Sequence, residues 1–282
     1  MPVVGRMIPM GLLIQTKRRW VQALSLLALN SNFRGFPQLG GCLPVLNCQY
    51  CHLAWLGCPI GMTGVSLAAG AFPWLVLGLL LVAGLIVGRF FCGWVCPAGF
   101  IQDLLYRIPL PKIRIPRFLV WIKYAVLLVM VVGAAWFLGQ GSLLYFCNVC
   151  PVSTTMVELP GMLAHNDYAV VAGRVVRVLV LVVVILLAIG NHRSFCKVFC
   201  PLGALMAVTN RFSLYSIRIK RDACVRCEQC DQACPMDVPA MRSQDRTRTV
   251  NADPECIECL VCEKICPTSA IIDDFHRAGR QP

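Results

Sequence analysis

Two segments of this sequence repeat each other without a gap, at an offset of 104 residues. Residues 89–107 (RFFCGWVCPAGFIQDLLYR) align with residues 193–211 (RSFCKVFCPLGALMAVTNR), and each copy follows a long apolar run. The identical positions are Arg89, Phe91, Cys92, Cys96, Pro97, Gly99 and Arg107, matched by Arg193, Phe195, Cys196, Cys200, Pro201, Gly203 and Arg211. A duplicated helical unit predicts two helix pairs related by a pseudo-twofold axis. Such an axis brings the four cysteines of the two copies towards one point.

Four apolar runs are long enough, or nearly so, to cross a bilayer, which takes about 20 residues. They are residues 20–36, 65–88, 118–139 and 168–190. Hydrophobic residues make up 57% of the chain and charged residues 14%, against about 25% charged in a soluble domain. We therefore predict an α-helical polytopic membrane protein with about four transmembrane helices in two pseudo-symmetric pairs. We expect Lys123, near one end of the third run, to extend its ammonium group to the membrane surface.

The net charge of +12 at pH 7 comes entirely from residues 1–210, because residues 211–282 hold as many acidic as basic residues. Basic residues concentrated in an apolar region indicate membrane orientation and not nucleic-acid binding. With four spans, only Arg34, Arg174 and Arg177 of this region face outwards. The distribution predicts a multi-pass protein of a prokaryotic plasma membrane, in contact with lipid, with both termini in the cytoplasm.

The C-terminal region carries one cysteine spacing twice. CVRCEQCDQACP and CIECLVCEKICP both follow C-x2-C-x2-C-x3-C-P, the spacing of bacterial ferredoxins with two clusters. In that arrangement the fourth cysteine of each motif ligates the other cluster. The sequence thus predicts two [4Fe–4S] clusters, one held by Cys224, Cys227, Cys230 and Cys266, the other by Cys256, Cys259, Cys262 and Cys234.

A change of composition after residue 211 divides the chain. Residues 1–211 are expected to form the transmembrane domain, with its internal repeat at about 40–107 and 140–211. Residues 212–282, in which SLYSIRIK alternates like a strand, are expected to form an α+β ferredoxin domain. Neither motif has a glycine after its second cysteine, since Glu228 and Leu260 stand there. Glu228 and Glu258 are expected to add negative charge beside the clusters.

The paired FCxxxCPxG motifs, the four apolar runs and the C-terminal ferredoxin motifs together resemble a family of membrane-bound ferredoxins. It includes the membrane quinol dehydrogenase component of periplasmic nitrate reductase systems, the methylamine-utilisation membrane ferredoxin and the membrane half of the nitrous-oxide reductase regulator. The resemblance covers roughly residues 62–282. It implies electron transfer between the quinone pool and a redox partner protein. The segment CLPVLNCQYCHLAWLGCP and its echo CNVCP depart from the nitrate-reductase member, so its partner is not carried over.

Ten cysteines remain outside the ferredoxin motifs. Cys92, Cys96, Cys196 and Cys200 are candidate redox cysteines that ligate a further cluster, form dithiols or simply pack in the interior. The second candidate group, with either a metal site or structural disulfides as its role, is Cys48, Cys51, Cys58, Cys147 and Cys150. Cys42 has no partner in the pattern.

Charged residues on the predicted outer side are the remaining candidates. Arg174 and Arg177 are expected either to balance the charge of a quinone or cluster, as candidate cofactor-binding residues, or to reach the outer interface. Glu158, His165 and Asp167 either accept quinol protons or lie in a solvated loop.

The sequence therefore predicts an electron-transfer subunit of an oxidoreductase, of the quinol dehydrogenase type. The alternative is an assembly factor that supplies electrons for metal or disulfide reduction while another enzyme matures. A structural anchor for a soluble ferredoxin-dependent enzyme is a third possibility.

Overall fold

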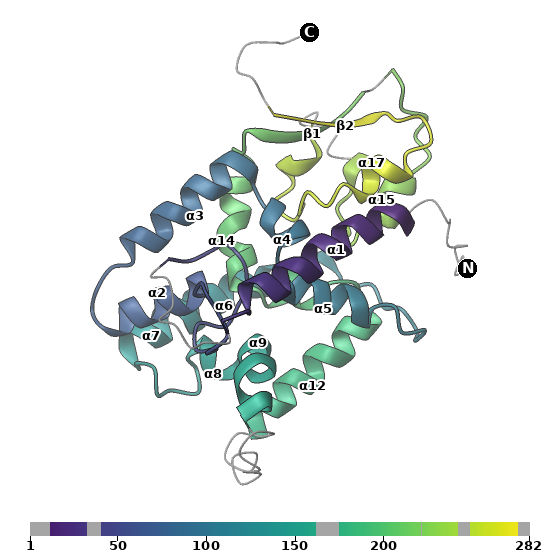
Figure 1. The fold of residues 1–282 in the computed structure, drawn as a ribbon. Coiled ribbons are helices and arrows are strands. Elements are labelled where there is room, and N and C mark those ends of the chain that lie inside the picture. Colours follow the sequence, from purple (N-terminus) through teal and green to yellow (C-terminus); the bar gives the residue numbers. More distant parts are fainter. Residues whose placement is uncertain (1–11, 33–40, 162–174, 221, 242–248, 276–282) are drawn as a thin grey trace.

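The computed structural model describes residues 12–32, 41–161, 175–220, 222–241 and 249–275. A helical domain forms the larger part, and a smaller domain with a two-stranded sheet lies against it (Figure 1). The first half of the helical domain contains α1 (Leu12–Leu29), α2 (Pro59–Ala68), α3 (Trp74–Val87), α4 (Phe90–Trp94) and α5 (Pro97–Leu105). Helices α4 and α5 carry the first copy of the repeated motif.

The second half follows the same order of elements. A continuous helical segment, Arg117–Phe137, consists of η2 (Arg117–Trp121), α6 (Ile122–Val126), the π-helical η3 (Leu127–Gly133) and α7 (Ala134–Phe137). It is followed by α8 (Phe146–Val149), α9 (Pro151–Ser153), the π-helical η4 (Thr154–Glu158), α12 (Val175–Gly190), α13 (Ser194–Val198) and α14 (Pro201–Asn210). Helices α13 and α14 carry the second copy of the repeated motif.

The packing of the helices relates the two halves. Helix α3 packs against α14, while α12 packs against α5, so each long helix contacts the motif helix of the other half. Helix α1 packs against α4 and α5 in the way that α6 packs against α13 and α14. The duplication thus extends to α1 and the 117–137 segment, beyond the boundaries that the motif alone predicted.

Two of the predicted apolar runs differ from the structure. The run at 65–88 is not one helix, because Gly70 adopts a φ of 73° and Pro73 follows it, so α2 ends at Ala68 and α3 begins at Trp74. Helix α3 is therefore only about 21 Å long at 1.5 Å per residue. The run at 20–36 belongs to a helix that begins at Leu12 and ends at Leu29.

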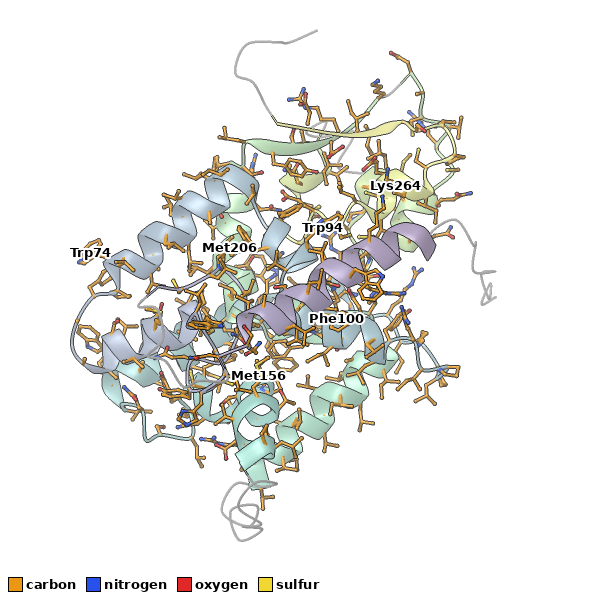
Figure 2. The ribbon with its side chains drawn as sticks, viewed as in Figure 1. Trp74, Trp94, Phe100, Met156, Met206 and Lys264 are labelled. Atoms are coloured by element: carbon orange, nitrogen blue, oxygen red, sulfur yellow. The ribbon has the colours of Figure 1, made fainter. Side chains whose placement is uncertain are left out.

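Among the described residues, one helix is long and apolar enough to cross a membrane, namely Arg117–Phe137, with a mean hydropathy of 2.2. Helices α2, α3 and α12 are apolar but shorter. Large apolar side chains cover their outer surfaces: Trp74 projects from α3 and is 76% exposed, and Leu179 and Leu186 of α12 are also exposed (Figure 2). The expectation that Lys123 extends to the membrane surface was wrong. Its side chain is fully buried and pairs with Glu255 of the smaller domain.

The smaller domain, hereafter the tail domain, begins after α14. Strand β1 (Tyr215–Ile219) pairs antiparallel with β2 (Ile271–Phe275), with Tyr215 opposite Phe275. Three short elements lie between the strands: α15 (Gln229–Ala233), η5 (Val250–Ala252) and α17 (Val261–Ile265). The strand expected within SLYSIRIK is present as β1. Helices α15 and α17 pack against each other and follow the two cysteine loops.

Candidate metal centres

The tail cysteines surround two cavities. The first tail cavity, of about 350 Å³, is lined by Cys224, Cys227, Cys230 and Cys266. The second tail cavity, of about 380 Å³, is lined by Cys234, Cys256, Cys259 and Cys262, with Cys230 at its edge. The structure therefore brings together the two sets of thiols that the motif spacing predicts, each with its fourth cysteine from the other motif. Four thiolates around a cavity suit a cubane cluster.

The two cysteine loops of the tail have matching backbone conformations. Arg226 and Glu228 of the first loop have φ values of 52° and 57°, and Glu258 and Leu260 of the second loop have the same two values. This left-handed conformation is one that glycine adopts most easily. Since the loops adopt it without glycine, interactions beyond the local sequence must stabilise this conformation in both loops.

The cysteines of the internal repeat meet at the junction of the two halves. Cys96 and Cys200 immediately precede α5 and α14, each before a proline. The thiols of Cys92, Cys96, Cys196 and Cys200 lie close enough to interact electrostatically. We name this group the inner cysteine group. Hydrogen bonds reach its sulfurs: Gln102 Nε2 donates to Cys196 Sγ at 3.2 Å, and the Gly203 amide donates to Cys200 Sγ at 3.2 Å.

Two buried arginines cross between the halves beside the inner cysteine group. Arg193 donates from Nη1 to the Cys92 carbonyl oxygen at 2.8 Å and binds both carboxylate oxygens of Asp103 at 2.8 Å. Arg89 is likewise buried, lies beside Cys200 and Cys196, and is 3.5 Å from Glu255. Both guanidinium groups therefore lie beside the thiols while each is paired with a buried carboxylate.

The inner cysteine group is in direct contact with the tail domain. Cys92 and Cys196 pack against the tail core that includes Cys256 and Cys259. A Cβ atom added to Gly93 of α4 would lie 2.3 Å from the Ile257 carbonyl oxygen. Trp94 Nε1 donates to the Glu258 carbonyl oxygen at 3.0 Å, and Figure 2 shows Trp94 between the two domains. Helix α4 therefore lies directly on the ligand loop of the second tail cavity.

Glu258 differs from its sequence-based expectation. Its side chain is completely buried, and burial raises its pKa to about 8. Burial thus opposes the negative charge that was expected at this position. Glu228, by contrast, lies on the exposed surface of the tail.

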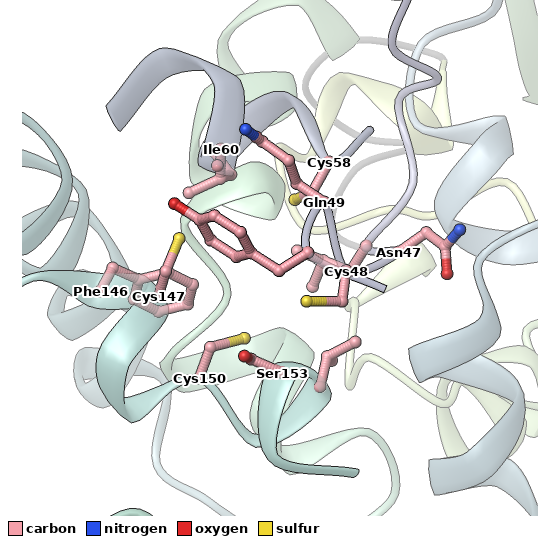
Figure 3. Close-up of a pocket in the computed structure, with 13 residues that line it drawn as sticks. Asn47, Cys48, Gln49, Cys58, Ile60, Phe146, Cys147, Cys150 and Ser153 are labelled. Atoms are coloured by element: carbon pink, nitrogen blue, oxygen red, sulfur yellow. The ribbon is translucent and has the colours of Figure 1, made fainter. Parts of the chain in front are cut away.

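A further cavity, of about 340 Å³, lies in the helical domain and is lined by Cys48, Cys58, Cys147 and Cys150. We name it the outer cavity; Figure 3 shows the four thiols arranged around it. Cys51 is not among them, and its thiol donates to the Met156 carbonyl oxygen at 3.7 Å. Cys42 is buried in the main core of the helical domain. Across the described residues, no three His, Cys, Asp or Glu side chains are arranged to hold a single metal ion.

Arg177, at the start of α12, lies next to the outer cavity. Its Nη1 is 2.6 Å from Glu158 Oε1 and its Nη2 donates to Asn148 Oδ1 at 2.8 Å. It interacts electrostatically with Cys147. Arg174, Arg34, His165 and Asp167 lie outside the described residues. Glu158 thus pairs with an arginine instead of lying free in a solvated loop.

Several site residues were not singled out from the sequence: Arg89, Arg193, Gly99, Gly203, Gln102 and Asp103. For the arginines and glycines the signal was present, since they are identical in the two copies of the motif. Asp103 also had a signal, because it is one of three acidic residues in the first 210. Its partners are Arg18 of α1 and the consecutive residues His192 and Arg193, which lie between α12 and α13.

The comparison with protein families agrees with the cysteine geometry. A family described as "4Fe-4S binding domain" matches residues 68–116 and again residues 173–221, and each match contains one copy of the inner motif. A family described as "4Fe-4S dicluster domain" matches residues 216–267. The chain therefore binds 4Fe–4S clusters, in agreement with the tail motifs. No solved structure matches the chain.

Curated relatives extend over most of the chain. The uncharacterized protein MJ0750 of Methanocaldococcus jannaschii is 29% identical over 69% of this chain and 76% of its own length. The putative electron transport protein YccM of Escherichia coli is 28% identical over 75% of this chain and 58% of its own length. The ferredoxin-type protein NapH of Escherichia coli is 30% identical over 73% of this chain and 70% of its own length.

These findings establish the general activity as iron–sulfur electron transfer. They also confirm the resemblance drawn from the FCxxxCPxG motifs. The chain belongs to the family of membrane-bound, ferredoxin-type electron transport proteins.

Proposed function

We propose that this protein transfers electrons between the quinone pool of a prokaryotic plasma membrane and a redox partner protein, through clusters in the tail domain and a further cluster on the inner cysteine group. The observation that carries the proposal is the contact between Gly93 of α4 and Ile257 of the tail. It sets the inner cysteine group directly against the second tail cavity, so that electrons have a short path between them.

In the proposed ligand sets, the first tail cavity takes Cys224, Cys227, Cys230 and Cys266, and the second takes Cys256, Cys259, Cys262 and Cys234. The inner cysteine group supplies two thiolates from each half of the helical domain. A [4Fe–4S] cluster in such a set accepts and returns one electron. The protein's own contribution is to orient the thiolates, through Gln102 and the Gly203 amide, and to hold Arg89 and Arg193 beside them.

A multi-pass arrangement in the membrane is supported by the apolar surfaces of the helices. The segment Arg117–Phe137 is long enough to span, and α3 and α12 present exposed apolar side chains that would be unfavourable in water. The four spans of the proposal are α1, α3, 117–137 and α12. The basic residues on the tail side of these helices support a cytoplasmic tail domain.

The proposal is tested with the full-length protein in anaerobic liposomes that contain a quinone. Oxidation of one quinol releases two electrons and two protons, so quinol should reduce the clusters and generate their EPR signals, while added quinone should reoxidise dithionite-reduced protein. Cys92→Ala should slow both reactions. Cys51→Ala is the matched control, because the Cys51 thiol contacts Met156 and lines none of the cavities described.

Two results would contradict this proposal. The first is that the clusters respond to dithionite but neither to quinol nor to quinone. The second is reduction of copper or of a protein disulfide by dithionite-reduced protein at the same rate with and without quinol, which would favour an assembly factor.

A further inference from the structure

The outer cavity has no role in the family matches, which begin after Cys58 and leave out Cys147 and Cys150. We propose that Cys48, Cys58, Cys147 and Cys150 ligate an additional [4Fe–4S] cluster in this cavity. Two of its ligands come from the first half of the helical domain and two from the second, as in the inner cysteine group. The site extends the proposed electron path, although its existence does not depend on quinone chemistry.

The tail cavities provide an internal standard for this site. The outer cavity, of about 340 Å³, is close in size to the first tail cavity, of about 350 Å³, and to the second, of about 380 Å³. All three are lined by at least four cysteines. A chain that binds 4Fe–4S clusters thus presents, in the part that the structure describes, a further cavity lined by four thiols like its ferredoxin sites.

The backbone at the outer ligands also matches that of the tail ligands. Cys150 has φ and ψ of −67° and 122°, and Cys234 has −69° and 119°. Cys58, at −72° and 128°, and Cys266, at −68° and 115°, are similar. Each of the four precedes a proline, which favours this extended conformation. The outer cavity and the tail therefore share the backbone conformation of their Cys-Pro residues.

The surroundings of the outer cavity shield its thiols and place an arginine beside them. Cys48, Cys58 and Cys150 are each less than 10% exposed, so the ligand sulfurs are largely shielded from solvent. Arg177 interacts electrostatically with Cys147 and is held in place by Glu158 and Asn148. This holds the guanidinium group of Arg177 beside Cys147 as part of an ion pair with Glu158.

The arrangement of the thiols favours a cluster over disulfides. A disulfide requires two sulfurs about 2 Å apart and would leave the space between the remaining groups empty. In the structure the four cysteines are separate thiols that line one cavity together with Tyr50 and Phe146 (Figure 3). Such an arrangement accommodates a cubane, to which four thiolates bind from different sides.

The outer cavity lies on the side of the helical domain that is far from the tail strands. Helices α8 and α9, which carry Cys147 and Cys150, lie on the side of the helical domain away from β1 and β2 (Figure 1). The hydrocarbon core of a membrane is about 30 Å thick. An outer cluster would therefore extend the line of redox centres from the tail towards the opposite membrane surface.

The test is iron and sulfide analysis of the full-length protein, purified without oxygen. Cys150→Ser should lose about four iron and four sulfide per chain relative to the wild type, the content of one cubane. Cys58→Ser should lose the same amount, and the double variant no more. Cys51→Ser is the matched control, because it removes a neighbouring thiol outside the cavity and should lose none. Unchanged EPR signals from the tail clusters show that each variant is folded.

Other outcomes would overturn the proposal. They are unchanged iron in Cys150→Ser, or the loss of one zinc per chain in place of iron. A measurement without any variant checks the disulfide alternative. In wild-type protein that is denatured and stripped of metal without a reductant, all 18 cysteines should titrate as thiols, whereas a count lower by two or four would show disulfides. The tail and inner clusters do not affect these comparisons, so failure here is distinct from failure of the proposed function.

Discussion

Arg193 of the second half lies over Gly99 of the first half, with its Nη2 atom 3.1 Å from the position that a Cβ atom on Gly99 would occupy. The reciprocal pair shows the same relationship, since Arg89 Nη2 lies 3.0 Å from the corresponding position on Gly203. Each half therefore leaves room, at the glycine of its Cys-Pro-x-Gly motif, for the buried arginine of the other half. This exchange explains why arginine and glycine recur together in both copies, and it joins the halves around the inner cysteine group.

A side chain at either glycine should disturb this exchange. We expect Gly203→Ala to displace Arg89 and to lower stability by about 1–3 kcal/mol, a typical cost of overpacking. Iron bound at the inner cysteine group should fall at the same time. Thermal unfolding in detergent and iron analysis measure the two effects. Gly78→Ala in α3 is the control, because nothing lies within 4 Å of its Cβ position, and equal losses in the two variants would refute the explanation.

Asp103 should be essential for the stability of the helical domain. It binds Arg193 through both carboxylate oxygens and also pairs with Arg18, and all three side chains are buried. Asp103→Asn would leave two buried guanidinium groups without a counter-charge, which costs about 3–5 kcal/mol. Arg117→Gln removes an ion pair whose arginine is 52% exposed and should cost less than about 1 kcal/mol. Similar melting temperatures for the two variants would contradict this prediction.

The exchange of ligands between the tail motifs predicts a pattern of additivity. Cys266→Ala combined with Cys227→Ala should lose about four iron per chain, because both residues serve the first tail cavity. Cys266→Ala combined with Cys262→Ala should lose about eight, because these two serve different cavities although they are close in sequence. If the variant with Cys266→Ala and Cys262→Ala lost only about four iron instead, each motif would hold its own cluster.

Features that depend on residues close together in the sequence could be predicted from the sequence, whereas features that depend on distant residues could not. The tail cavities depend on local cysteine spacing, and the meeting of Cys92 with Cys196 depends on the repeat, so both could be anticipated. The buried pair Lys123–Glu255 joins residues 132 positions apart, and no local pattern indicates it. The interruption between α2 and α3 at Gly70 and Pro73 was missed, because the hydropathy of a segment does not report its backbone conformation.

The same reasoning explains why the sequence did not show which of the outer cysteines line the outer cavity. Their spacing differs between the halves, C-x9-C for Cys48 and Cys58 but C-x2-C for Cys147 and Cys150, so no repeat identified the ligand set. Cys51 lies outside the lining and contacts Met156, 105 residues away. Only the folded chain separates it from Cys48.

The orientation of the protein can be tested with reporter fusions. The basic residues on the tail side predict a cytoplasmic tail domain, so alkaline phosphatase fused after residue 282 should be inactive and a fluorescent protein there should be active. Phosphatase fused after Gly141, in the loop before α8, should be active and serves as the control. The reverse pattern would place the outer cavity in the cytoplasm and contradict the proposed topology.

The most direct test of the account concerns a single centre shared by the two halves. Iron and sulfide are measured in full-length Cys92→Ala, Cys196→Ala and the double variant, with the tail EPR signals as a check on folding. The account predicts that each single variant lacks about four iron relative to the wild type and that the double variant lacks no more, because one missing ligand already removes the shared cluster. Unchanged iron in all three variants, with the tail clusters intact, would contradict it.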